Sequence, residues 1–140
     1  MIQSTVNILL VEDNEVDVEA VKRAFAKQRI ANPIHVASDG VQALELLRGD
    51  FLRPFLIILD INLPRMNGIE FLQEVRKDPE LKDSVVFVLT TSKRDEDKVA
   101  SYDLNVAGYM VKEAVGKDFM RLTDMLGSYW RIVELPPARG

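Results

Sequence analysis

The sequence predicts an α/β protein built on a parallel sheet that is covered by helices on both faces. Two observations lead to this prediction. Short apolar segments rich in β-branched residues recur along the 140 residues, and a stretch with helical periodicity follows each one. The apolar segments are also nearly continuous in hydrophobicity, which is typical of strands buried on both sides of a parallel sheet.

The first two units of this pattern are well marked. Strands are expected over residues 6–11 and 34–37, and Pro33 ends the turn before the second. The helix after the second strand is expected to begin at Ser38-Asp39-Gly40 and to stop at Gly49. The periodic apolar residues of the two helices are Val18, Val21, Phe25, Val41, Leu44 and Leu47.

The remaining units follow the same order. Strands are expected over residues 55–59, 84–89 and 108–111, and a loop dense in turn residues covers 62–68. A helix runs to about residues 78–79, a weaker amphipathic helix covers 95–104, and a last helix follows the fifth strand. The periodic apolar residues of the first and last of these helices are Ile69, Leu72, Val75, Phe119, Leu122, Leu126 and Tyr129.

Polar residues stand at the ends of four of the predicted strands. The first strand ends in Glu12-Asp13, the third in Asp60, the fourth in Thr90 and the fifth in Lys112. In a parallel sheet the carboxyl ends of the strands meet at one edge, where ligands bind. The topology alone therefore predicts a site with three carboxylates, a hydroxyl and an ammonium group.

This set of groups is suited to phosphoryl transfer. Three clustered carboxylates repel one another by about 4 kcal/mol per close pair at a moderate effective dielectric, and a hard divalent cation such as Mg²⁺ relieves that repulsion. Lys112 could neutralise a phosphoryl oxygen, and Thr90 could donate a hydrogen bond to another. One carboxylate would be the nucleophile and the others would bind the metal, because phosphoryl transfer requires mainly positioning and charge neutralisation.

Each residue taken alone has a plainer interpretation. Glu12-Asp13 could be a solvated turn or a helix cap, and Asp60 could be a turn residue before the loop. Thr90 could be a helix N-cap, and Lys112 could be an ordinary surface lysine. Their joint occurrence at strand ends favours the functional interpretation.

The sequence closely resembles the receiver domains of two-component response regulators. Five stretches carry the resemblance: ILLVEDN at 8–14, ASDGVQAL at 37–44, LDINLPRMNG at 59–68, VLTT at 88–91 and YMVK at 109–112. The resemblance implies a flavodoxin-like (βα)5 doubly wound sheet with strand order 2-1-3-4-5 in a domain over residues 5–130. It implies a switch protein and not an enzyme, catalysing only its own phosphorylation and dephosphorylation.

The resemblance also implies roles for particular residues. Asp60 would accept a phosphoryl group from a histidine of a sensor kinase. Asp13 and Asp60 would bind Mg²⁺ directly, with the backbone carbonyl of Asn62 as a third ligand and Glu12 acting through water. The remaining residues would bind the phosphoryl group or respond to it, and these are Thr90, Thr91, Tyr109 and Lys112.

Two positions depart from the family pattern. Glu113 follows Lys112 where the family usually has proline, so a cis peptide bond there would cost roughly 3 kcal/mol. Thr91 stands where many receivers carry a smaller residue, which could narrow access to the acyl phosphate. Neither departure removes a chemical group from the site.

The end of the chain suggests a subgroup and a dimer. Residues 131–140 are too few for a DNA-binding domain, and the tail resembles those of single-domain regulators paired with bacterial phytochrome kinases. We expect the tail to form an arm exchanged between the subunits of a homodimer; the alternative is a tail folded on its own domain. The residues of the expected arm are Trp130, Ile132, Val133 and Leu135.

Composition excludes several other classes. Lys and Arg number 18 against 22 acidic residues, a formal charge of −4, and they form no basic run, so no nucleic-acid partner is expected. There is no cysteine for a disulfide or thiolate metal site. No signal segment and no apolar run of roughly 20 residues is present, so we expect a cytoplasmic protein without membrane contact.

Two rival functions fit less well. Aspartate-nucleophile phosphatases require a second Asp two residues after the nucleophile, and here that residue is Asn62. A flavin-binding module needs free N–H groups after the first strand, where Glu12-Asp13 would repel the flavin phosphate. His35 lies within an apolar strand and is interpreted as structural.

Overall fold

A computed structural model describes residues 6–27, 31–49, 55–92 and 94–111 of the chain. Five strands form one parallel sheet in the order β2-β1-β3-β4-β5, which confirms the predicted fold and strand order. The strands are β1 (Asn7–Val11), β2 (Ile34–Ala37), β3 (Phe55–Leu59), β4 (Val86–Thr90) and β5 (Gly108–Val111).

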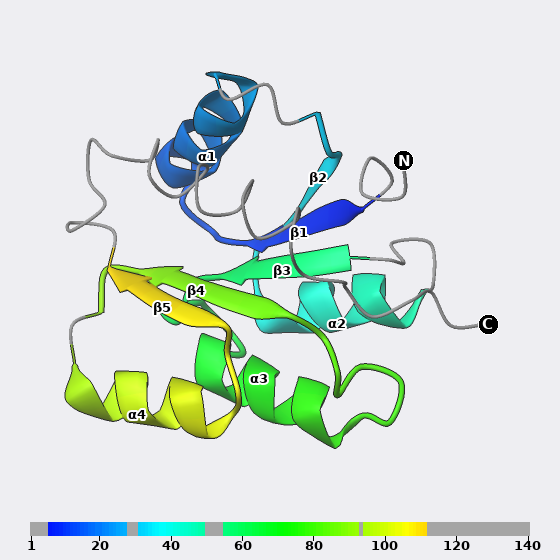
Figure 1. Ribbon diagram of the computed structural model, residues 1–140, viewed down its shortest axis with the longest axis vertical. Coiled ribbons are helices and arrows are strands. Elements are labelled where there is room, and N and C mark those ends of the chain that lie inside the picture. Colours follow the sequence, from blue (N-terminus) through cyan, green and yellow to red (C-terminus); the bar gives the residue numbers. More distant parts are fainter. Residues whose placement is uncertain (1–5, 28–30, 50–54, 93, 112–140) are drawn as a thin grey trace.

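Helices cover both faces of this sheet (Figure 1). In the described part of the chain, α1 packs on one face, and α2, α3 and α4 pack on the other. The helices are α1 (Glu15–Lys27), α2 (Gly40–Arg48), α3 (Gly68–Lys77) and α4 (Asp95–Asp103). The expected last helix lies outside the described residues.

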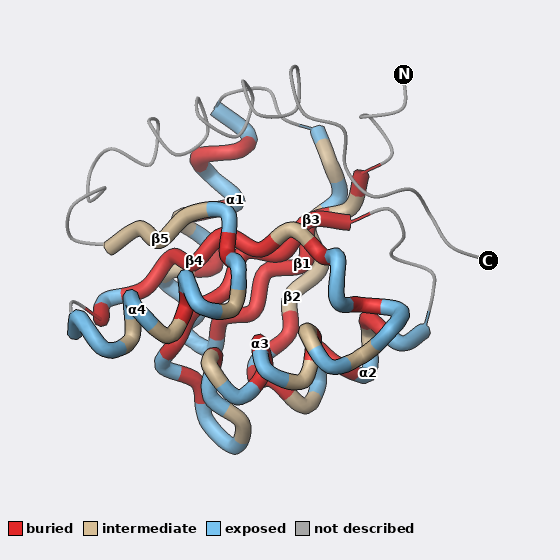
Figure 2. The backbone as a smooth tube through the Cα atoms, turned by 60° about the horizontal axis from the view of Figure 1, so that its bottom comes forward, coloured by how far each residue is buried: buried red, intermediate tan, exposed pale blue. Residues whose placement is uncertain are grey.

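The core consists of two layers, one on each side of the sheet, because successive strand residues point to opposite faces. One layer places Leu10 and Ile58 against Val21 and Phe25 of α1. The other layer packs the opposite sheet face against α2 and α3, with Phe71 and other side chains fully buried. Figure 2 shows β1, β3 and β4 as the buried centre of the molecule, with the outer strands β2 and β5 of mostly intermediate burial and the helices buried on their inner sides.

The helix ends follow the sequence signals closely. Asp39 caps α2 by accepting a hydrogen bond from the Gln42 N–H at 2.9 Å, and Gly49 is the C-cap. Asn67 and Glu70 form a reciprocal capping box at the start of α3. The buried stripe of α2 is shifted from the expected one, since Ala43 is fully buried and Val41 only half-buried.

Arg76 of α3 joins two loops at the amino edge of the sheet by hydrogen bonds. The guanidinium of Arg76 donates to the carbonyl oxygens of Leu104 (2.7 Å) and Asn105 (3.1 Å) between α4 and β5. It also donates to the carbonyl oxygens of Lys82 (2.9 Å) and Ser84 (2.7 Å) before β4. Arg76 therefore holds the α3–β4 loop next to the α4–β5 loop. Burial lowers the pKa of its guanidinium.

Candidate functional site

The candidate site lies at the carboxyl edge of β1 and β3. Val11 and Leu59 are register partners in these neighbouring strands, so the next residues, Glu12 and Asp60, emerge side by side. The Asp60 N–H donates to the Val11 carbonyl at 3.0 Å, and the Glu12 N–H donates to the Ala37 carbonyl at 2.9 Å. Backbone hydrogen bonding thus continues one residue beyond the strands and fixes both acidic residues.

Glu12, Asp13 and Asp60 form an acidic cluster. Each offers a carboxylate oxygen, and these oxygens all lie within 4.8 Å of one another. Glu12 and Asp60 are buried, with 4% and 5% of their surface exposed, whereas Asp13 is exposed. Carboxylate oxygens are the donors that hard divalent cations prefer, so the residues fit such an ion, which would also relieve their repulsion.

The carboxylate of Asp60 is held by two hydrogen bonds to the same oxygen. The Thr90 hydroxyl donates to Oδ1 at 2.7 Å, and the Asn62 N–H donates to it at 3.0 Å. Thr90 is fully buried as the last residue of β4, so its hydroxyl is fixed by the strand. The fourth strand therefore contributes the hydroxyl directly to the acid cluster.

Asn62 and Thr91 lie on the exposed rim of the site. The side-chain amide of Asn62 donates to Oγ1 of Thr91 at 3.3 Å, and both residues are exposed. This contact joins the loop after β3, which follows Asp60, to the loop after β4, which follows Thr90.

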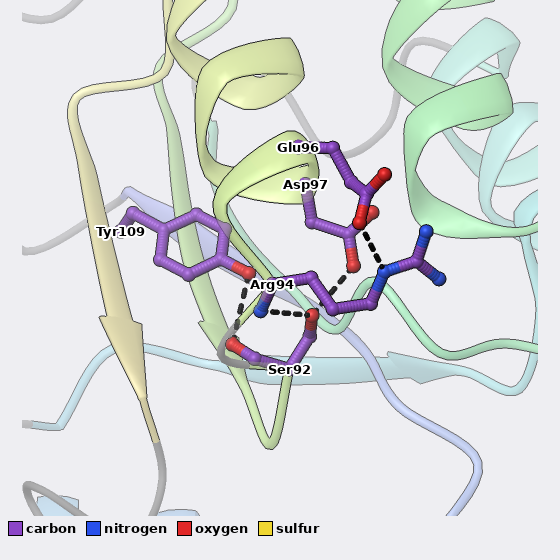
Figure 3. Close-up of polar contacts among 5 residues, drawn as sticks. All are labelled: Ser92, Arg94, Glu96, Asp97 and Tyr109. Carbon is purple, nitrogen blue, oxygen red and sulfur yellow. Dashed lines mark hydrogen bonds and ion pairs between the residues drawn. The ribbon is translucent and has the colours of Figure 1, made fainter.

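Ser92 links the end of β4 to α4 and β5, and Figure 3 shows its contacts with Asp97 of α4 and Tyr109 of β5. Its N–H donates to Thr90 Oγ1 at 3.3 Å, and its carbonyl accepts a hydrogen bond from the Tyr109 hydroxyl at 3.0 Å. Its own hydroxyl donates to Oδ2 of Asp97 at 2.5 Å. Burial raises the pKa of the Tyr109 phenol, and the charges of Asp97 and Asp60 act in the same direction.

Several residues with roles in this geometry carried no functional prediction from the sequence. Asp39 was expected only as part of a helix start, yet it also binds Arg65. Ser92 contacts Asp97, five residues later, and the more distant Tyr109, and the signal available was the position of Ser92 directly after Thr90-Thr91. Lys112 and the expected arm residues Trp130, Ile132, Val133 and Leu135 lie outside the described residues.

A pocket extends the acidic cluster along α1. Its charged lining residues are Glu12 and Asp13 after β1 and Glu15, Glu19 and Lys22 of α1. The rest of the lining comes from Val18 of α1 and from Val36 and Ser38 on the β2 side.

Among the described helices, none has both the length and the apolar character needed to cross a membrane.

Comparisons with known proteins agree with this geometry. The family model described as response regulator receiver domain matches residues 8–124. The response regulator Rcp1 of Synechocystis sp. is 38% identical over 137 residues, covering 94% of this chain and 93% of Rcp1.

Two solved structures are also similar to the chain. The phosphorylated cyanobacterial phytochrome response regulator RcpA has a TM-score of 0.84 and 35% identity, covering 94% of this chain and 99% of RcpA. The Mn²⁺-bound form of Rcp1 has a TM-score of 0.79 and 37% identity, covering 92% and 97% of the two chains. These matches agree with the fold and with the acidic cluster at the strand ends. The chain belongs to the response regulator receiver family and is a phosphorylation-controlled regulator of two-component signalling.

Proposed function

We propose that Asp60 is the phosphoacceptor of this response regulator. The observation that carries the proposal is the buried Asp60 carboxylate in a cluster with Glu12 and Asp13, hydrogen-bonded to the Thr90 hydroxyl at 2.7 Å. A buried carboxylate at a strand end is fixed in place, which supplies much of what phosphoryl transfer needs from a protein. Its neighbours are acidic, so the site favours a cation before the anionic donor arrives.

In the proposed reaction a carboxylate oxygen of Asp60 attacks the phosphorus of a phosphohistidine on a sensor kinase. The O–P bond forms while the N–P bond breaks, and the electron pair of that bond returns to the imidazole. We propose Mg²⁺ as the resident ion, bound by Asp13, Asp60, the Asn62 carbonyl and, through water, Glu12; it would neutralise charge on the transferred group. Rcp1 has been crystallised with Mn²⁺, which supports a divalent cation at this site.

Phosphorylation changes the acceptor that Thr90 faces. The carboxylate oxygen that now accepts its hydrogen bond becomes part of an acyl phosphate, and the phosphoryl oxygens offer stronger, more highly charged acceptors. A shift of the Thr90 hydroxyl would alter its contact with the Ser92 N–H, and Ser92 also contacts Tyr109 and Asp97. The proposed output is therefore a population shift on the surface formed by α4 and β5.

Other parts of the proposal concern the rim residue Thr91, groups outside the described residues, and the partners. Lys112 would bind a phosphoryl oxygen, and Thr91 at the rim would limit access of water to it. The partner would be a sensor histidine kinase of the phytochrome type, since RcpA is a phytochrome response regulator. We further propose a cytoplasmic homodimer whose subunits are joined through the arm that contains Trp130, Ile132, Val133 and Leu135. The protein would act as a switch, with no catalytic activity beyond its own phosphorylation and dephosphorylation. It would contact neither nucleic acid nor a membrane.

The test is intact-protein mass after incubation with acetyl phosphate and Mg²⁺. We expect one added phosphoryl group on the unaltered protein and none on Asp60→Asn or after chelation of the metal. Asp95→Asn removes an exposed carboxylate of α4 and serves as the matched control, with labelling equal to that of the unaltered protein. Labelling that persists in Asp60→Asn would overturn the assignment of the acceptor.

A further inference from the structure

The loop between β3 and α3 is bound to the start of α2 by an ion pair. Both Nε and Nη2 of Arg65 lie 2.7 Å from Oδ2 of Asp39. Asp39 is buried, and its other oxygen caps α2 through the Gln42 N–H at 2.9 Å. The carboxylate of Asp39 that binds Arg65 is therefore also held by the backbone of α2, so it acts as a rigid anchor for the loop.

A second contact binds the next loop residue to the same helix start. The Gly40 N–H donates to the Met66 carbonyl at 3.3 Å. A Cβ atom on Gly40 would lie 2.8 Å from Cγ of Met66, so the packing of Met66 leaves no room for a side chain there. Two consecutive loop residues are thus held by two consecutive residues at the start of α2.

The ends of the same loop are held against Asp60. The Gly68 N–H donates to the Ile61 carbonyl at 2.8 Å, and a Cβ atom on Gly68 would lie 2.7 Å from the Asp60 carbonyl oxygen. Arg65 adopts a left-handed backbone conformation with φ of 60°, which is costly for a residue with a side chain. The surrounding contacts must offset that cost, and the ion pair between the Arg65 side chain and Asp39 is one of these contacts.

Asn62 lies within the segment that these contacts enclose. Its N–H donates to Oδ1 of Asp60, and its carbonyl is the proposed metal ligand from the loop. We propose that Asp39 and Arg65 are positioning residues for the metal site: their ion pair fixes the loop conformation that brings Asn62 to the acidic cluster. This inference rests on the proposed function, and neither residue touches the metal or the phosphoryl group in it.

The chain supplies a matched control pair. Arg48 in the last turn of α2 lies 3.2 Å, Nε to Oδ2, from Asp78 at the C-cap of α3. This pair has the same residue types and also holds α2 against the α3 unit, but it joins the last turn of α2 to the C-cap of α3, away from the acidic cluster. Any effect common to Arg65→Ala and Arg48→Ala therefore reports on helix packing and not on the site.

The experiment measures Mn²⁺ affinity from the electron paramagnetic resonance signal of the free ion, without a phosphodonor. We expect Arg65→Ala to weaken Mn²⁺ binding about tenfold, as removal of groups that orient metal ligands does elsewhere, while Arg48→Ala leaves it unchanged. Asp39→Asn keeps an oxygen for the cap but removes the charge, and it should weaken binding in the same direction. Circular dichroism and urea unfolding establish that each variant is folded.

A double-mutant cycle gives the deciding result. If the two residues act through their ion pair, Asp39→Asn combined with Arg65→Ala should weaken Mn²⁺ binding no more than the more severe single change. Additive losses, or equal affinities for Arg65→Ala and Arg48→Ala, would overturn the inference, as would an unaltered protein that binds no Mn²⁺. Failure of the phosphoacceptor assignment would appear separately, as labelling that does not depend on Asp60 while Mn²⁺ binding is intact.

Discussion

The Thr90 hydroxyl donates a 2.7 Å hydrogen bond to Oδ1 of Asp60, and both side chains are buried. The same hydroxyl accepts a hydrogen bond from the Ser92 N–H at 3.3 Å. It therefore stands between the acidic cluster and the loop that leads to α4. Four predictions test this arrangement and the fold that supports it.

Replacing Thr90 with valine tests the role of the hydroxyl. The change removes a hydrogen bond to a buried carboxylate, so we expect the free energy of unfolding to fall by about 1–2 kcal/mol in urea titrations. Beryllofluoride, a phosphoryl mimic, should change hydrogen exchange over residues 90–97 in the unaltered protein and in Thr90→Ser, but not in Thr90→Val. An unaltered response in Thr90→Val would show that the loop does not follow this hydroxyl.

Asp60→Asn should stabilise the metal-free protein. The amide can still accept hydrogen bonds from Thr90 and from the Asn62 N–H, while one of the three clustered charges is removed. We expect the free energy of unfolding to rise by about 1 kcal/mol in chelator, and the stabilisation by Mg²⁺ to become smaller. A lower stability of Asp60→Asn in chelator would mean that repulsion in the cluster is not significant.

Tyr109→Phe tests the raised pKa of the Tyr109 phenol. The folded state holds the phenolic proton more tightly than the unfolded state, whose pKa is near 10.0. This contribution to stability is therefore complete below that pH and is lost as the pH rises through the folded-state pKa. As the pH rises above about 10, the free energy of unfolding in urea should fall less in Tyr109→Phe than in the unaltered protein. The control is Tyr102→Phe, which changes a half-exposed side chain and should follow the unaltered protein.

Arg76→Lys separates the fold from the site. Lysine cannot reach four carbonyl oxygens in two loops, so we expect a loss of about 2–3 kcal/mol in the free energy of unfolding. Labelling by acetyl phosphate at a temperature where the variant is folded should be unchanged, because these loops lie at the opposite edge of the sheet. Lys77→Ala removes only an exposed 3.9 Å ion pair to Glu74 and should change stability by less than about 1 kcal/mol.

Much of the fold could be predicted because periodicity is a local property of the sequence. The strands Ile34–Ala37, Phe55–Leu59 and Gly108–Val111 have the bounds that the apolar segments indicate. The fourth strand differs: it begins at Val86 and includes Thr90, since Thr90 is the register partner of Val111 in β5. Pairing between strands decides that boundary, and the residues of one strand alone do not reveal it.

The acidic cluster could be predicted because topology brings strand ends together. Glu12, Asp13 and Asp60 needed only a parallel sheet with β1 beside β3. The contacts of Arg65 with Asp39, of Tyr109 with Ser92 and of Arg76 with Leu104 could not be predicted, because each depends on the exact path of segments that are distant in the sequence. Polar side chains in loops have no periodicity from which a partner can be inferred.

The pairing of β1 with β3 has a consequence for the folding reaction itself. These strands are not consecutive in the chain, so Glu12 and Asp60 come together only after the segment that contains β2 has been enclosed. The repulsion of Asp60 by Glu12 and Asp13 is therefore absent from the denatured ensemble and falls on the native side of the transition. A cation bound there acts on the native basin, so we expect the unfolding rate, more than the refolding rate, to depend on the concentration of divalent ions.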